Sequence, residues 1–123
     1  MKLDPMMRLL DVYRAEVDAY RQVLHLAREG VECVRQGRPL SDLQLINLEK
    51  KRWLDDIRAL ESSVDAEKIE WQRRHRLGPR HADLDALLGQ IMGLIEEIMD
   101  QERETDQWIV RAAGLEQSQL ATA

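Results

Sequence analysis

Apolar residues recur in alternating steps of three and four along most of the chain, and this spacing predicts three long helices. The first row is Met6, Leu10, Tyr13, Val17, Tyr20, Leu24, Ala27, Val31 and Val34. The second row is Leu43, Ile46, Lys50, Trp53, Ile57, Leu60, Val64, Glu67 and Trp71. The third row is Leu84, Leu87, Ile91, Leu94, Ile98, Gln101, Thr105, Trp108, Ala112 and Leu115. Rows of this kind are typical of coiled-coil-like helices that pack at small crossing angles, so we expect an all-α antiparallel bundle of three long helices.

Two glycine–proline segments separate the three rows. Gly37 can take the left-handed conformation that ends a helix, and Pro39 prevents the helix from continuing. Gly78 and Pro79 repeat this arrangement before the third row. The pattern predicts one domain over residues 1–123, with helices at about 5–36, 41–76 and 82–113 and a frayed tail over 116–123.

Helix starts are marked by residues that can accept a hydrogen bond from the first free backbone amides. Asp4 precedes a proline in the manner of a cap for the first helix. Ser41 and Gln44 have the spacing of a capping box for the second helix, and Asp83 is the expected cap of the third.

Two features weaken the predicted helices internally. The pair Ser62 and Ser63 interrupts the second helix, since serine side chains compete for backbone hydrogen bonds, and we expect a kink there. Gly89 and Gly93 weaken the third helix, each by about 1 kcal/mol relative to alanine.

The composition agrees with an all-helical protein. Six glycines and three prolines among 123 residues are too few to supply the turns of a β-sandwich or barrel. The hydrophobic share of 44% is too high for a disordered chain. Few loops also disfavour most enzymes, because catalytic residues tend to lie on loops.

The charges are unevenly distributed along the chain. Residues 1–81 carry 16 Lys and Arg against 14 Asp and Glu, whereas residues 82–123 carry 2 against 9, which gives the net charge of −5. The acidic third helix would repel a phosphate backbone, so we expect no nucleic-acid partner. One basic cluster stands apart from this trend and comprises Arg73, Arg74, His75, Arg76, Arg80 and His81. It could bind an acidic partner, or it could simply place cations at a helix C-terminus.

No pattern for catalysis, cofactor binding or metal binding is present. None of His25, His75 and His81 has the glutamate three residues earlier that helical di-iron sites need. Cys33 is the only cysteine, which excludes an internal disulfide, and its acidic neighbours indicate a structural thiol. No apolar run reaches membrane-span length and no signal peptide is evident, so the sequence predicts a cytoplasmic protein that is not an enzyme.

Lys50 interrupts the second apolar row and has two interpretations. Its ammonium group could extend past the apolar surface to solvent while the stem stays buried. Alternatively, it could pair with a glutamate across the bundle and fix the register. We expect the first arrangement.

The third helix has a second apolar row beside its first. The extra row is formed by Leu88, Met92, Ile95 and Met99. An apolar face of this width belongs either to a central helix or to a helix that binds a partner, and methionine adapts to irregular partners. Acidic residues adjoin this row, among them Glu96, Glu102 and Asp106. The combination would suit a basic amphipathic helix, so these seven residues are the candidate partner site.

The helices also resemble those of the FlgN family of flagellar export chaperones. The residues that carry the resemblance are Leu9, Leu10, Tyr13, Glu16, Gly37, Leu43, Ile46, Lys50, Leu54, Ile57, Leu60, Leu87, Leu88, Ile91, Leu94, Ile95 and Ile98. The resemblance implies a cytoplasmic, non-catalytic protein that binds the C-terminal helices of hook–filament junction proteins and delivers them to the type III export machinery. A coiled-coil interaction or homodimerisation module without a secreted client is the open alternative.

Overall fold

A computed structural model describes the backbone of residues 4–74 and 81–122. It contains four helices, α1 (Pro5–Arg35), α2 (Leu40–Ser63), α3 (Asp65–Arg74) and α4 (Ala82–Thr122). No strand occurs in the described residues. The expectation of an all-α protein is therefore confirmed.

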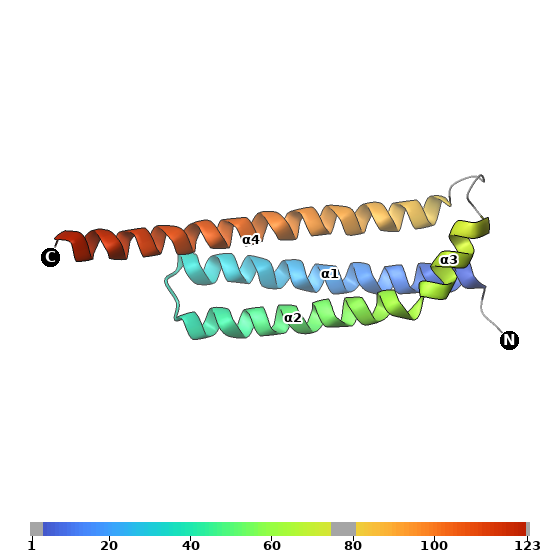
Figure 1. The fold of residues 1–123 in the computed structure, drawn as a ribbon, viewed down its shortest axis with the longest axis horizontal. Coiled ribbons are helices and arrows are strands. Elements are labelled where there is room, and N and C mark those ends of the chain that lie inside the picture. The colour runs from blue at the N-terminus through green and yellow to red at the C-terminus, as the bar shows by residue number, and fades with distance from the viewer. Residues whose placement is uncertain (1–3, 75–80, 123) are drawn as a thin grey trace.

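The helix α1 lies in the middle of the molecule, with α2 along one side and α4 along the other (Figure 1). The chain reverses between α1 and α2, and α4 then runs in the same direction as α1. Within the described residues, no Cα atom of α2 comes within 8 Å of one of α4. Both outer helices therefore pack their backbones against α1, and α2 and α4 approach each other only through side chains.

The ends of α1 follow the sequence-based expectations. The carboxylate of Asp4 accepts a hydrogen bond from the Met6 amide at 3.2 Å, and Pro5 occupies the first helical position. Gly37 has a φ of 66°, and the Arg38 amide donates to the Cys33 carbonyl at 3.0 Å. This is the Schellman arrangement, in which a left-handed glycine lets the chain close the last helical turn.

The starts of α2 and α4 differ from the expectations. The helix α2 begins at Leu40 after Pro39, without a side-chain cap, so the capping role expected for Ser41 is wrong. Instead of Asp83, it is His81 that caps α4, because its Nδ1 accepts a hydrogen bond from the Leu84 amide at 3.3 Å. An imidazole nitrogen three residues earlier can satisfy a free amide just as a carboxylate does.

The kink expected at the serine pair is a complete break between two helices. The Ser63 hydroxyl donates to the Leu60 carbonyl at 2.6 Å, and Val64 leaves the helical conformation with a φ of −120°. This competition for a helical carbonyl is the cause expected from the sequence. The break turns α3 across the end of the molecule (Figure 1), so the single helix expected over 41–76 is two helices. At the other end of the chain, α4 runs on to Thr122, past the expected end at 113.

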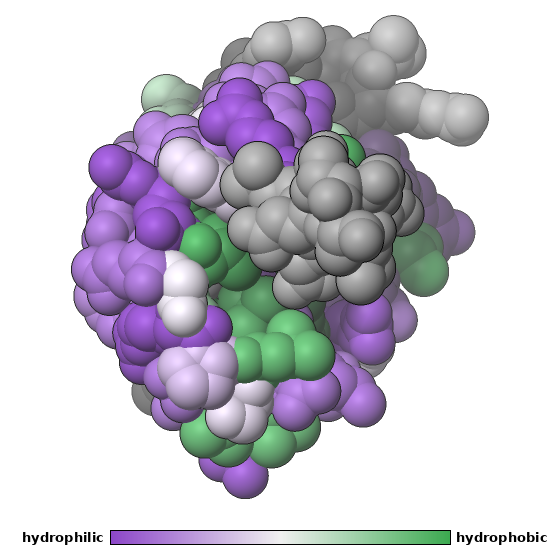
Figure 2. Space-filling view, turned by 90° about the vertical axis from the view of Figure 1, so that its left-hand side faces the viewer, coloured by the Kyte–Doolittle hydropathy of each residue, from purple (hydrophilic) through white to green (hydrophobic). Residues whose placement is uncertain are grey.

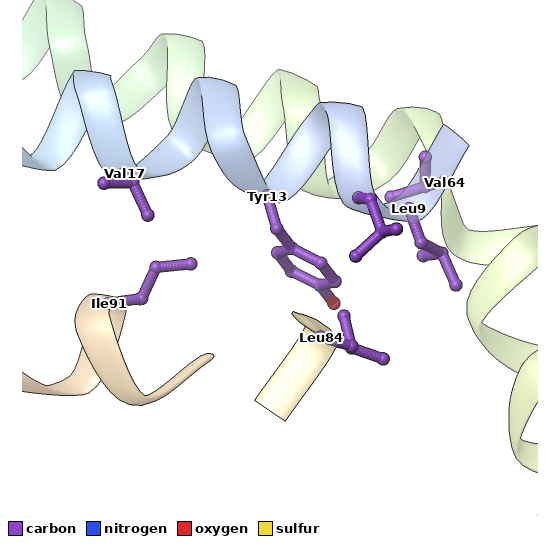
Figure 3. Close-up of a cluster of buried hydrophobic side chains, with 7 residues drawn as sticks. Leu9, Tyr13, Val17, Val64, Leu84 and Ile91 are labelled. Carbon is purple, nitrogen blue, oxygen red and sulfur yellow. The ribbon is translucent and has the colours of Figure 1, made fainter. Parts of the chain in front are cut away.

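The largest core cluster lies where α3 meets the start of α1 and α4, and we call this region the closed end. Its buried members are Leu9, Leu10, Tyr13, Val17, Val64, Leu84 and Ile91. Figure 3 shows the Tyr13 ring between α1 and Leu84 of α4, with Val64 arriving from the break after α2. Three chain segments thus exclude water from this end of the molecule.

Candidate functional site

An apolar groove lies between α2 and α4 along the middle of the molecule. Its floor is the surface of α1 at Tyr20 and Val23, and its volume is about 540 Å³. The α2 wall consists of Asn47, Lys50, Lys51, Leu54, Asp55 and Arg58. The α4 wall consists of Ile95, Ile98, Met99 and Glu102. We call this feature the α2–α4 groove; it exists because α2 and α4 flank α1 without close contact between their backbones.

Side chains close the groove at both ends. Beyond one end, a Cβ atom built at Gly30 of α1 would lie 3.6 Å from Leu43 Cδ1 and 3.7 Å from Thr105 Oγ1, so side chains of α2 and α4 both reach α1 here. Beyond the other end lies the closed-end cluster, against which the groove residues Tyr20 and Ile95 also pack. The groove therefore has a defined length. Its α2 wall from Asn47 to Arg58 corresponds to about 17 Å of helix, or three turns.

One ion pair crosses the groove. The ammonium group of Lys50 on α2 pairs with the Glu102 carboxylate on α4, and the Lys50 side chain is only 12% exposed. The expectation that Lys50 extends to solvent is wrong, and its alternative of a pair across the bundle is what the structure shows. Because the Glu102 side chain keeps 42% exposure, this pair sits at the mouth of the groove and not in a dry core.

The seven residues expected to form the partner site separate into three groups. Ile95, Met99 and Glu102 line the groove. Leu88 is half-buried and packs against the closed end. The remaining three residues are exposed outside the groove and are Met92, Glu96 and Asp106. The apolar row of the third predicted helix is thus part core and part surface, with Met92 at 64% and Met99 at 53% exposure.

The α2 wall of the groove was not expected from the sequence. Lys51, Asp55 and Arg58 belong to none of the sites predicted from the sequence, and Leu54 was named only among the residues that carry the FlgN resemblance. One signal was available, because Lys50, Leu54 and Arg58 stand four residues apart and so share one helix face. The spacing could not show that this face of α2 borders the space between α2 and α4.

Glu16 is a buried carboxylic acid on α1, about one helical turn before the groove residue Tyr20. Its side chain is 1% exposed, and neither carboxylate oxygen has a hydrogen-bond partner in the described residues. Burial raises the pKa of Glu16 to about 7, an effect that the positive charge of Lys68 partly opposes. Burial, together with the Glu16 charge, also raises the pKa values of Tyr13 and Tyr20 above their ordinary range.

Lys68 connects this acid to α3. Its ammonium group pairs with Glu61 at the end of α2 and lies 5.9 Å from the centre of the Tyr13 ring. Arg8 of α1 adds a second link, to Glu67 of α3 at 3.5 Å. These charges hold α3 against α1, so Glu16 lies among groups that anchor the closed end.

A second hollow lies at the end of the molecule that carries the α1–α2 connection. Its apolar lining includes Leu40, Leu43, Trp108 and Ile109, and its volume is about 450 Å³. Figure 2 views the molecule from this end and shows apolar surface in the middle of the face with polar surface beside it. Cys33 also borders this hollow but is itself buried, as expected for a structural thiol.

Three further features concern metal binding, membrane spans and the basic cluster. Residues 4–74 and 81–122 contain no cluster of His, Cys, Asp and Glu side chains placed to hold a metal ion. None of the helices in this part of the chain has the length and apolar character needed to cross a bilayer. Of the basic cluster, Arg73 is exposed at the end of α3, while residues 75–80 lie outside the described residues.

Comparison with known proteins does not assign the chain to a family. No family model matches it, and neither a similar curated protein nor a similar solved structure was found.

Proposed function

We propose that this protein is a cytoplasmic helix-binding chaperone that holds an amphipathic client helix in the α2–α4 groove. The long helices α1, α2 and α4 act as an antiparallel bundle of three, and the client takes the position of a fourth. The protein catalyses no reaction. Its resemblance to FlgN chaperones supports a specific client, the C-terminal helix of a hook–filament junction protein held for the type III export machinery.

The observation that carries this proposal is an open, largely apolar groove that extends over about three helical turns, with Leu54 on its α2 wall and mostly apolar residues on its α4 wall. A helix in a groove is read by apolar side chains spaced three and four residues apart, and Leu54, Ile95 and Met99 offer contacts on both walls. Met99 is a suitable wall residue because its unbranched side chain adapts to different partners.

The expected affinity is moderate. Apolar burial contributes about 25 cal/mol per Å², and ordering the client helix offsets part of this gain. A short groove therefore favours micromolar binding with rapid release, which suits a chaperone that must surrender its client.

The methionines of α4 provide a matched test of this proposal. Met99 lines the groove, whereas Met92 lies on the same helix, is similarly exposed and does not line it. We expect Met99→Asp to weaken binding of a junction-protein C-terminal peptide by about tenfold or more, and Met92→Asp to leave binding unchanged. Binding is measured by fluorescence anisotropy, and circular dichroism verifies that both variants stay folded. Equal binding by both variants and the parent protein would reject the groove as the client site.

Homodimerisation is the rival function, and it is supported by exposed apolar residues on α2. Leu40, Leu45 and Leu48 of α2 are all more than half exposed. If a second copy fills the groove, the protein should sediment as a dimer, and Met99→Asp should convert it to a monomer. The chaperone proposal expects a monomer that binds one client peptide. A stable dimer disrupted by Met99→Asp would favour the rival.

A further inference from the structure

We propose that the α2–α4 groove selects an amphipathic helix with acidic side chains on one edge of its apolar face. This acidic edge lies against α2. This inference rests on the proposed function, which supplies a helix as the occupant. An acidic occupant differs from the basic client helix expected from the sequence. The reason is that cations line the α2 wall of the groove, whereas α4 as a whole is acidic.

The α2 wall has an excess of positive charge. Lys50, Lys51 and Arg58 line it against the single anion Asp55. Arg58 pairs with Asp55 at 3.4 Å in an exposed contact that solvent weakens, and Lys50 pairs with Glu102. No ion pair of Lys51 is seen within the described residues, and its side chain is exposed. Lys51 is therefore the cation best placed to receive a carboxylate from an occupant.

The acidic residues of α4 do not offset this excess. Only Glu102 lines the groove, and it is already engaged by Lys50. Glu97 pairs with Arg28 of α1 at 3.4 Å, and Asp100 pairs with Arg103 on its own helix. The acidic run that suggested a basic partner is thus directed mainly to other surfaces or already paired.

Spacing adds a requirement to the occupant. Lys51 and Arg58 are seven residues apart on α2, which is two turns and about 10.5 Å. A helix lying alongside α2 would meet both cations with acidic residues at positions i and i+7 of its own edge. The apolar residues between those positions would then face Leu54 and Met99.

The test uses two designed peptides with the same apolar face. One carries glutamate at positions i and i+7 of the edge directed at α2, and the other carries lysine there. We expect the glutamate peptide to bind the full-length protein about tenfold more tightly at low salt, with the difference shrinking as salt rises. A junction-protein C-terminal peptide is measured in parallel.

A pair of protein variants locates the effect. Lys51→Glu should abolish or reverse the preference between the two peptides. Arg52→Glu makes the same change in charge one residue further along, but Arg52 lies outside the groove, beside Glu49 and Leu45. This control should keep the preference of the parent protein. Both residues are exposed, so both variants should fold.

The outcomes separate this inference from the proposed function. A parent protein that binds the lysine peptide as tightly as the glutamate peptide, or more tightly, overturns the charge inference and leaves helix binding intact. The same loss of preference in Lys51→Glu and Arg52→Glu also overturns it, because a long-range charge effect would then suffice. If neither the designed peptides nor the junction-protein peptide bind, the proposed function fails and the inference fails with it.

Discussion

The closed end and the α2–α4 groove are built on the same helix but are packed to different degrees. At the closed end, α1 is covered by α3, α4 and the residue that follows α2, and Leu9, Val64 and Leu84 are almost fully buried. Two helical turns further along α1, only α2 and α4 flank the helix; Val23 is still only 1% exposed, but Tyr20 is half-buried and lines the open groove.

The difference shows what a third covering element contributes. Two helices that pack on opposite sides of a third leave part of its surface exposed unless they also meet each other. At the closed end α3 supplies the missing cover, because the break at Val64 turns the chain across α1. The serine pair thus has two effects, since it ends α2 and it determines where the core stops and the groove begins.

Truncating one leucine in each region should give the largest contrast. Leu84 is 2% exposed at the closed end, whereas Leu54 is 38% exposed on the groove wall. We expect Leu84→Ala to lower the free energy of unfolding by about 3 kcal/mol, because it leaves a cavity, and Leu54→Ala to lower it by less than about 1 kcal/mol. Urea denaturation measures both. Similar losses would mean that the groove is closed in solution.

Glu16 marks the boundary between the two regions and should give a pH-dependent effect. Its pKa of about 7 in the folded protein exceeds the ordinary 4.5, so the folded state binds the proton more tightly. The contribution of Glu16 to stability should therefore rise as the pH falls from about 7 to 4.5. We expect Glu16→Gln to stabilise the protein by about 2 kcal/mol at pH 8, with the gain vanishing near pH 4.5.

Thermal or urea denaturation across this pH range tests the effect of Glu16. Glu49→Gln, on the exposed side of α2, is the matched control and should not change the pH profile. A constant difference between Glu16→Gln and the parent at all pH values would show that the buried acid does not titrate in this range.

The ion pair across the groove should have a smaller effect. Lys50→Met removes the cation that pairs with Glu102, but Glu102 is exposed enough to turn toward solvent. We expect a loss of about 1 kcal/mol, below the several kcal/mol of a fully buried pair. Lys51→Met is the control on the same wall and should leave stability unchanged. If Lys50→Met were equally harmless, the ion pair would not stabilise the native state.

Glycine-to-alanine changes on α4 should have the same effect in both regions. A Cβ atom at Gly89, beside the closed end, or at Gly93, beside the groove, would meet no atom within 4 Å. We expect each glycine-to-alanine change to stabilise the protein by up to about 1 kcal/mol, since only helix propensity changes. Thermal unfolding measures both. Markedly different gains would reveal contacts of α4 that differ between the two regions.

Local signals in the sequence predicted much of the fold. The ends of α1 were predicted correctly because Asp4, Pro5 and Gly37 act through backbone geometry within a few residues. The interruption at Ser63 was also found, although its extent was underestimated. The predicted caps of α2 and α4 were wrong. The helix α2 begins after a proline without a side-chain cap, and at α4 an imidazole takes the place of the expected carboxylate.

The groove could be predicted only in part. Apolar spacing identifies which face of a helix is buried, but it does not state which helices meet across that face. The residues Ile95, Met99 and Glu102 were found because they lie on one recognisable face of α4. The opposite wall at Lys51 and Leu54 depends on the separation of α2 from α4, which is a tertiary property. For the same reason, the pairing of Lys50 could not be distinguished from solvation.

The central position of α1 also has a consequence for the order of folding. Contacts between α1 and α2 begin close to the Gly37 turn, where Cys33 and Leu43 share a cluster, so this hairpin needs only a short loop to start. Contacts between α1 and α4 join residues far apart in sequence, such as Arg28 and Glu97. Because closing a longer loop costs more entropy, we expect the hairpin to form first and α4 to dock last. Pulse-labelled hydrogen exchange should then protect the amides of α2 before those of α4.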